Sequence, residues 1–255
     1  MAKAEDLLIA LDDGHGIDTS GKRTPEVTEI GRAIKENEFN SEVVKYMDEH
    51  LKYIGFKTLL VAPTDVDTSL NARTNLANSK GADAYISIHF DAMGSVWGNA
   101  EGHSIFVLPG ATTSKKLAEC VAGFLQQGTS QKWRGIKEQN FHVLRETKMP
   151  AILSENGFMD NPREARLMLD INFQKEVARE HVRGICKYFG VSYKEKKEGG
   201  NNVANEEYEK NAKPSPSLET EYNAAVKAGI TDGTYPKRPA TREEVAVMIL
   251  RGIKK

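Results

Sequence analysis

The sequence has few cysteines, few aromatic residues and no excess of charge of either sign. Its 255 residues include two cysteines, Cys120 and Cys186, which are too few for a disulfide framework and are not spaced as a Cys-x-x-Cys metal site. Both lie in apolar helical patterns, so we expect them to be small core residues. The net charge of −1 argues against a protein that captures nucleic acid through bulk positive charge.

Long hydrophobic runs are also missing. No segment approaches the ~20 apolar residues that a membrane-spanning helix requires, so we expect no membrane span. The N-terminal segment MAKAEDLLIALDDGHG lacks the basic start, apolar stretch and cleavage site of a secretory leader. We therefore expect the chain to be made in the cytoplasm without a signal peptide.

Short apolar segments alternate with helical periodicities over most of the chain. The predicted strands span 7–12, 56–62, 84–90, 103–108, 141–144 and 151–155. Apolar residues recur at helical spacing over 39–54 and 177–189. This alternation predicts an α/β domain over residues 1–191, with a sheet covered by helices on both faces.

The composition changes after Val191. Residues 192–216 have almost no aliphatic side chains, many charges of both signs, and Gly, Asn and Pro residues, which predicts a linker. Residues 217–255 predict a small module of two helices, the second starting with a capping box formed by Thr241 and Glu244. Two helices bury little core, so we expect this module to need repeats, a partner or a wall contact.

Side chains able to bind a metal or move protons follow three of the predicted strands. They lie in the segments DDGHG, SIHFD and LSENG. Ligands bind at the carboxyl ends of the strands in open α/β sheets, because the loops open there into a crevice. We therefore expect His15 and His89 to lie close together, although a lone histidine is more often solvated or structural.

Two histidines suit zinc, and one further protein ligand would leave an open position for catalysis. The candidates for that ligand are Glu26, Glu29, Glu36, Glu38 and Glu42. If the helix over 39–54 begins at residue 36, Glu36 projects into the middle of its apolar stripe, whereas Glu38 and Glu42 project away from it. An unpaired inward carboxylate is costly, and a metal ion would neutralise it.

Glu155 ends the last predicted strand. A carboxylate at this place is a candidate general base toward water. The alternative is a glutamate that pairs with a nearby Lys or Arg. Asp12, Asp13 and Asp91 are further acidic candidates in the same region.

Four segments together resemble a known family. LDDGHG, KENEFN, SLNARTNLANSKGADAYISIHFDA and RGIKEQNFHVLRETKMPAILSENGFMDNPRE are similar to the zinc-dependent N-acetylmuramoyl-L-alanine amidases of the Amidase_3 type, found in bacterial autolysins and phage endolysins. The resemblance covers residues 7–190, with the segments in the family order. It implies a three-layer αβα sandwich around a mixed, largely parallel sheet, plus one zinc ion.

The resemblance also implies residue roles and a reaction. By position, His15, Glu36 and His89 match the family's metal ligands, and Glu155 matches its catalytic glutamate. The implied reaction cleaves the amide between N-acetylmuramic acid and L-alanine in bacterial peptidoglycan. Two positions depart from the family pattern: Asp91 stands where many relatives have Asn, and Asn156 where many have Thr. Neither change removes a ligand.

The C-terminal segment AVKAGITDGTYPKRPATREEVAVMILR resembles one S-layer homology repeat. This resemblance implies that residues 217–255 bind a secondary wall polymer, with self-association or a vestigial helical tail as alternatives. The recognisable residues are Thr241, Arg242 and Glu244, whereas the opening of the repeat matches poorly.

Two other functions compete with the amidase hypothesis. One is a zinc carboxypeptidase or endopeptidase that acts on the stem peptides, and the other is a non-catalytic wall-binding protein with a decayed metal site. For a chain without a leader, we expect access to the wall through holin-type release or cell lysis, from a phage endolysin or a bacterial autolysin.

Overall fold

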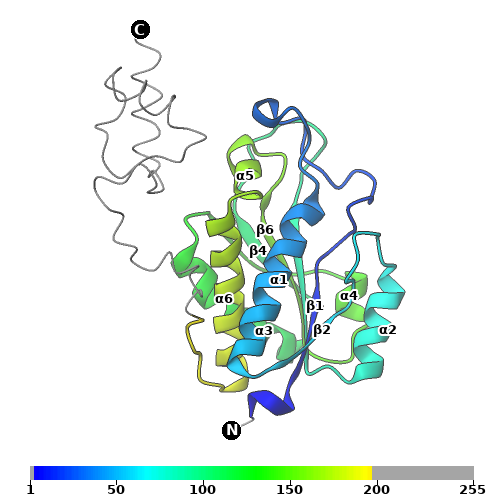
Figure 1. Ribbon diagram of the computed structural model, residues 1–255, viewed down its shortest axis with the longest axis vertical. Helices are drawn as coiled ribbons and strands as arrows, with labels where there is room; N and C mark the ends of the chain where they lie inside the picture. Colours follow the sequence, from blue (N-terminus) through cyan, green and yellow to red (C-terminus); the bar gives the residue numbers. More distant parts are fainter. Residues whose placement is uncertain (1–2, 197–255) are drawn as a thin grey trace, which may run out of the picture. The chain divides into compact units, whose positions relative to one another are not determined.

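A six-stranded mixed sheet organises residues 3–196, which are the residues that the computed structural model describes. The strands lie in the order β2-β1-β3-β6-β4-β5 (Figure 1). Their bounds are β1 (Leu8–Asp12), β2 (Lys57–Leu60), β3 (Ala84–Asp91), β4 (His103–Val107), β5 (Trp133–Glu138) and β6 (Ala151–Phe158). Strands β2, β1, β3 and β6 are parallel, whereas β4 pairs antiparallel with β6 and parallel with β5.

Helices cover both faces of this sheet. Their bounds are α1 (Glu36–Ile54), α2 (Leu70–Lys80), α3 (Thr112–Gly128), α4 (His142–Arg145), α5 (Pro162–Leu167) and α6 (Ile171–Phe189), with 3-10 turns η1 (Ala4–Asp6) and η2 (Thr28–Ile30). Helices α1, α3 and α6 pack side by side on one face, and α2 and α4 lie on the other (Figure 1). The predicted mixed, largely parallel αβα sandwich is confirmed.

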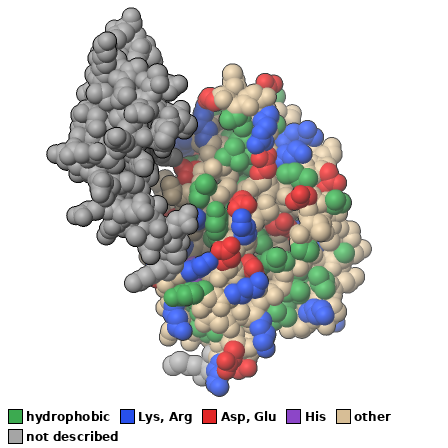
Figure 2. Space-filling view, in the orientation of Figure 1, with side chains coloured by type: hydrophobic (Ala, Val, Ile, Leu, Met, Phe, Trp, Pro, Cys, Tyr) green, Lys and Arg blue, Asp and Glu red, His purple; other side chains and the backbone are tan. Residues whose placement is uncertain are grey.

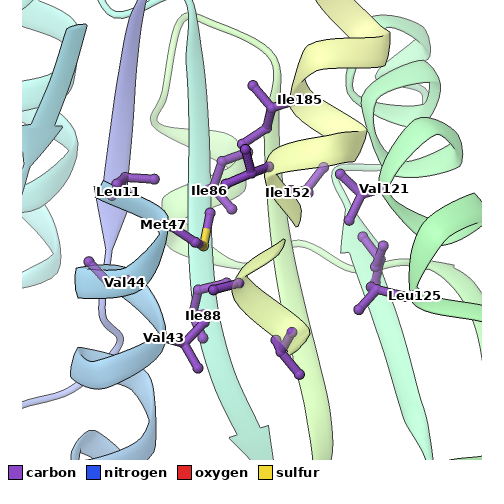
Figure 3. Close-up of a cluster of buried hydrophobic side chains, with 14 of the residues drawn as sticks. Leu11, Val43, Val44, Met47, Ile86, Ile88, Val121, Leu125, Ile152 and Ile185 are labelled. Carbon is purple, nitrogen blue, oxygen red and sulfur yellow. The ribbon is translucent and has the colours of Figure 1, made fainter. Parts of the chain in front are cut away.

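The larger core lies between the sheet and α1, α3 and α6. Strand residues such as Ile86, Ile88 and Ile152 meet Met47 of α1 and Ile185 of α6, and all five are fully buried (Figure 3). A smaller core, including Ala10, Tyr85 and Leu153, lies under α2 and α4. Because β1, β3 and β6 are buried on both faces, their sequences are nearly continuous apolar runs.

The strand order creates a topological switch point beside β1. The chain leaves β1 for β2 on one side, and α2 then returns it to β3 on the other side. The loops after β1 and β3 therefore separate at the carboxyl edge of the sheet, which is where doubly wound folds bind ligands. The segments DDGHG and SIHFD lie at this place.

One predicted strand was wrong and one strand was missed. Residues 142–144 fall on the single turn α4, with Phe141 as its N-cap, rather than on a strand. Three apolar residues in a run of four do not distinguish the two structures. The missed strand is β5, which lies at the edge of the sheet, contains Gly135 and leaves its side chains partly or fully exposed. Such a strand carries no clear apolar alternation.

The domain continues a few residues past α6. His50 Nε2 lies 2.9 Å from the carbonyl oxygen of Lys194, and Lys196 Nζ lies 2.7 Å from Glu49 Oε2. Most of the predicted linker and all of the predicted module at 217–255 lie outside the described residues. Between residues 3 and 196, no helix is both long and apolar enough to cross a membrane. Acidic and basic side chains are interspersed over the visible face (Figure 2).

Candidate metal centre

The loop after β1 presents His15 in an unusual backbone conformation. His15 has φ of 61°, and among the described residues it is the one non-glycine with positive φ. Gly14 precedes it, and a Cβ atom at Gly14 would lie 2.4 Å from Cε1 of His89. The loop can therefore bring the two histidine rings together only because residue 14 is a glycine. Their centroids are 4.9 Å apart.

Side chains from α1 hold this loop. Asn40 Nδ2 donates to the carbonyl oxygen of Gly14 at 3.0 Å, and Asn37 Nδ2 donates to that of His15 at 3.1 Å. These bonds satisfy carbonyl groups that the turn leaves without backbone partners. The first turn of α1 thus fixes the position of the loop that carries His15.

Glu36 begins α1 and points inward, with 1% of its surface exposed. Its Oε1 accepts from the backbone N–H of Phe90 at 3.2 Å and lies 3.0 Å from His89 Nδ1. Burial raises the pKa of Glu36, but the contacts with His89 and His15 outweigh burial and hold that pKa well below its usual value. Glu36 is therefore a carboxylate at neutral pH.

Three ligand atoms converge at this point. One atom each from His15, Glu36 and His89 lies within 4.8 Å of the other two. Glu36 Oε2 lies 3.6 Å from His15 Nε2, and it is buried without a hydrogen-bond partner among residues 3–196. Burial lowers the pKa of His15 to about 4, so its ring is neutral and can donate a lone pair. Two imidazoles and a carboxylate with an unsatisfied oxygen fit a zinc ion.

Glu155 lies directly beside this group. It is the register partner of His89 in the parallel pair of β3 and β6. Its Oε2 is buried and has no hydrogen-bond partner in the described part of the chain. Burial raises the pKa of Glu155 well above its usual value, and the negative charges of Glu36 and Asp91 raise it further. A buried carboxyl group with a raised pKa is a candidate for general acid–base catalysis.

A groove of about 590 Å³ runs past these residues. Its lining includes His15, His89 and Glu155, together with residues 67–70 and 141–143.

Several residues of the centre were not predicted from the sequence. Arg73 of α2 is 1% exposed and forms ion pairs with Asp12 and Asp67. The signal that could have revealed it is the pair of consecutive aspartates, Asp12 at the end of β1 and Asp13 after it, because buried carboxylates require a cation. Asn40 could have been found from its position four residues after Glu36, on the same face of α1.

The sequence comparison identifies a family and individual relatives. The family model described as N-acetylmuramoyl-L-alanine amidase, Amidase_3, matches residues 9–187. The N-acetylmuramoyl-L-alanine amidase CwlM of Bacillus licheniformis is 33% identical over 187 residues, which are 72% of this chain and 69% of that protein. The endolysin of Bacillus phage SPP1 is 30% identical over 197 residues, covering 76% and 69% of the two chains.

Solved structures agree with this assignment. The catalytic domain of CwlV, an amidase from Bacillus (Paenibacillus) polymyxa var. colistinus, superposes with a TM-score of 0.66 at 30% identity, covering 73% of this chain and 99% of that one. The amidase from Clostridium difficile 630 gives 0.66 at 31% identity, covering 74% and 98%. With this fold, and with the family model matched over residues 9–187, the chain belongs to the N-acetylmuramoyl-L-alanine amidase family of the Amidase_3 type.

Proposed function

We propose that the chain hydrolyses the amide between N-acetylmuramic acid and L-alanine in peptidoglycan, with one zinc ion held by His15, Glu36 and His89. The observation that carries this proposal is the convergence of three ligand atoms within 4.8 Å, with Glu155 opposite His89 on the neighbouring strand. A zinc ion at these residues would supply a Lewis acid that acidifies water and polarises a carbonyl group.

Glu155 would carry the proton in this reaction. Its Oε2 takes a proton from the attacking water, and the water oxygen bonds to the carbonyl carbon of the lactyl group. The carbon–nitrogen bond then breaks, and Glu155 delivers the proton to the departing amine of L-alanine. The raised pKa of Glu155 suits this role, because the carboxyl must hold the proton after taking it from water and before delivering it to the amine.

The test is the Glu155→Gln variant, assayed for clearing of a purified cell-wall suspension. We expect the rate to fall about 10²–10⁴-fold, which is the usual contribution of a general base. Zinc content should be unchanged, because Glu155 is outside the ligand set. Glu138→Gln, an exposed carboxylate at the end of β5, is the matched control and should lyse walls like the parent. Undiminished lysis by Glu155→Gln would refute the role given to Glu155.

We also propose that residues 217–255 direct the enzyme to a secondary wall polymer, and that the protein reaches the wall by holin-type release or cell lysis. Similarity to the SPP1 endolysin supports a lytic setting. Deleting residues 217–255 tests the targeting. The truncated chain should sediment less with whole walls, but it should still release peptide from fragmented peptidoglycan. Equal sedimentation would contradict the targeting role.

A further inference from the structure

The two ring nitrogens of His89 have different neighbours. Nδ1 lies 3.0 Å from Glu36 Oε1, whereas Nε2 lies 3.1 Å from Ser87 Oγ. A metal ion binds only an unprotonated ring nitrogen, so the nitrogen that keeps its proton cannot be the ligand. The hydrogen bonds of Ser87 therefore decide which ring nitrogen of His89 is free to bind a metal ion.

Ser87 has a single hydroxyl proton, and it donates that proton in a hydrogen bond to a buried carboxylate. Ser87 Oγ donates to Asp12 Oδ2 at 2.7 Å, and the hydroxyl of Tyr85 donates to the same oxygen at 2.8 Å. Burial raises the pKa of Asp12, but the Arg73 guanidinium and the other partners outweigh it and lower that pKa, so the carboxylate is ionised. A bond to an ionised acceptor is stronger than a neutral one. Ser87 Oγ is thus left to accept a proton from Nε2.

Arg73 links this chain of hydrogen bonds to the other histidine. Its Nη1 binds Asp12 Oδ1, and its Nη2 donates to the carbonyl oxygen of His15 at 3.2 Å. One buried guanidinium therefore contacts the loop that carries His15 and also supports the carboxylate that fixes Ser87.

We propose that Ser87 and Asp12 are positioning residues that hold the Nε2 proton of His89 and so present Nδ1 to the metal ion. This inference rests on the metal site proposed above and adds the identity of the ligand nitrogen. Metal-bound histidines commonly donate their second N–H to a carboxylate or carbonyl group. Here a serine hydroxyl stands between the ring and the carboxylate.

The direct test is NMR of the histidine ring nitrogens in the full-length, cadmium-loaded protein. We expect cadmium to couple to Nδ1 of His89, with Nε2 carrying a proton. Coupling to Nε2 would overturn the proposal and leave the amidase function standing. A wild-type protein that binds neither cadmium nor zinc would overturn the metal site and this inference together.

Two variants test the hydrogen-bond chain from His89 through Ser87 to Asp12. The readout is zinc affinity, measured by competition with a chromophoric chelator. Ser87→Ala should weaken zinc binding about 10–100-fold, the range found when such supporting partners are removed. Tyr85→Phe is the matched control: it removes the other hydroxyl on the same Asp12 oxygen without removing a partner of His89, and should change zinc affinity less than Ser87→Ala does. Equal losses in the two variants would assign Ser87 a merely structural role. If Ser87→Ala does not fold, the wild-type cadmium coupling still decides the question.

Discussion

Two groups of buried polar residues flank the sheet, and they handle charge in opposite ways. The arginine cluster consists of the buried residues Asp12, Arg73, Tyr85 and Ser87 with the exposed Asp67 at its edge, and its charges pair with one another. The helix-side cluster consists of His103, Thr129, Ser154, Glu180 and His181, at the contact of α3 and α6 with β4 and β6.

In the helix-side cluster, the ionisable groups are not paired with opposite charges from the described residues, and burial keeps them neutral. Burial lowers the pKa of His103 and of His181 to about 4, and burial together with Glu176 raises the pKa of Glu180 to about 9. The Glu180 carboxyl oxygens lack hydrogen-bond partners among the residues described. All three groups are neutral at pH 7. The two clusters therefore differ in how buried ionisable groups are accommodated: the arginine cluster pairs Asp12 with a cation, whereas the helix-side cluster holds its groups in their neutral forms.

The largest expected effect comes from breaking the arginine cluster. Arg73→Met leaves Asp12 buried without its cation, so we expect the free energy of unfolding to fall by about 3–5 kcal/mol in urea titrations. Arg183→Met is the control, because its pair with Glu195 is exposed and should contribute less than about 1 kcal/mol. Equal losses of unfolding free energy in the two variants would show that the buried arginine cluster stabilises the fold no more than an exposed ion pair does.

Replacing Glu180 should have the opposite effect and raise the free energy of unfolding. The pKa of Glu180 is about 9 in the folded chain and 4.5 in its reference state, so the folded protein holds a proton that the unfolded protein releases. Stability from this group is therefore full below pH 4.5 and is lost as the pH rises toward 9. Glu180→Gln should stabilise the protein by about 1–2 kcal/mol at pH 8, and by much less at pH 5, in thermal or urea unfolding. Glu49→Gln, on the exposed face of α1, should show no such difference. A destabilised Glu180→Gln at pH 8 would mean that Glu180 is ionised and paired.

A smaller effect is expected at acid pH. The pKa of His103 is about 4 in the folded chain against 6.5 in its reference state, so the unfolded chain binds more protons between these values. Stability is full above pH 6.5 and falls as the pH drops toward 4. His103→Phe keeps a ring against Trp133 but cannot take up a proton, and should remove about 1 kcal/mol of the loss measured between pH 6.5 and 4.5. An unchanged slope would locate the acid sensitivity elsewhere.

Residues along the edge of the sheet could be predicted from the sequence, whereas the residues that support them could not. The positions of His15, His89 and Glu155 toward the carboxyl ends of strands could be predicted, because an apolar β-run and the reactive side chain near its end are local features of the sequence. Glu36 required the additional assumption that α1 begins at residue 36, and the helix does begin there. Local patterns therefore locate the edge of the sheet and the side chains that lie on it.

The supporting residues could not be predicted in this way. Arg73 and Ser87 form hydrogen bonds with Asp12, which is distant in sequence. The aspartates at the end of the first predicted strand indicate that a cation is needed, but tertiary packing decides which residue supplies it. Helix α4 was mistaken for a strand because its four residues are too few to show a period. Strand β5 was missed because an exposed edge strand carries no apolar alternation.

We propose that His15, Glu36, His89 and Glu155 form the active site of a metal-dependent amidase. The most direct test is mass spectrometry of purified peptidoglycan digested by the full chain, with and without a chelator. We expect intact stem peptides with a free L-alanine amino terminus, glycan without peptide, no product under chelation, and recovery when zinc is added. Stems cut at internal bonds would instead identify a peptidase, and bound but uncleaved walls a non-catalytic wall-binding protein. Release of intact stems that is insensitive to chelation would contradict the role of the metal centre.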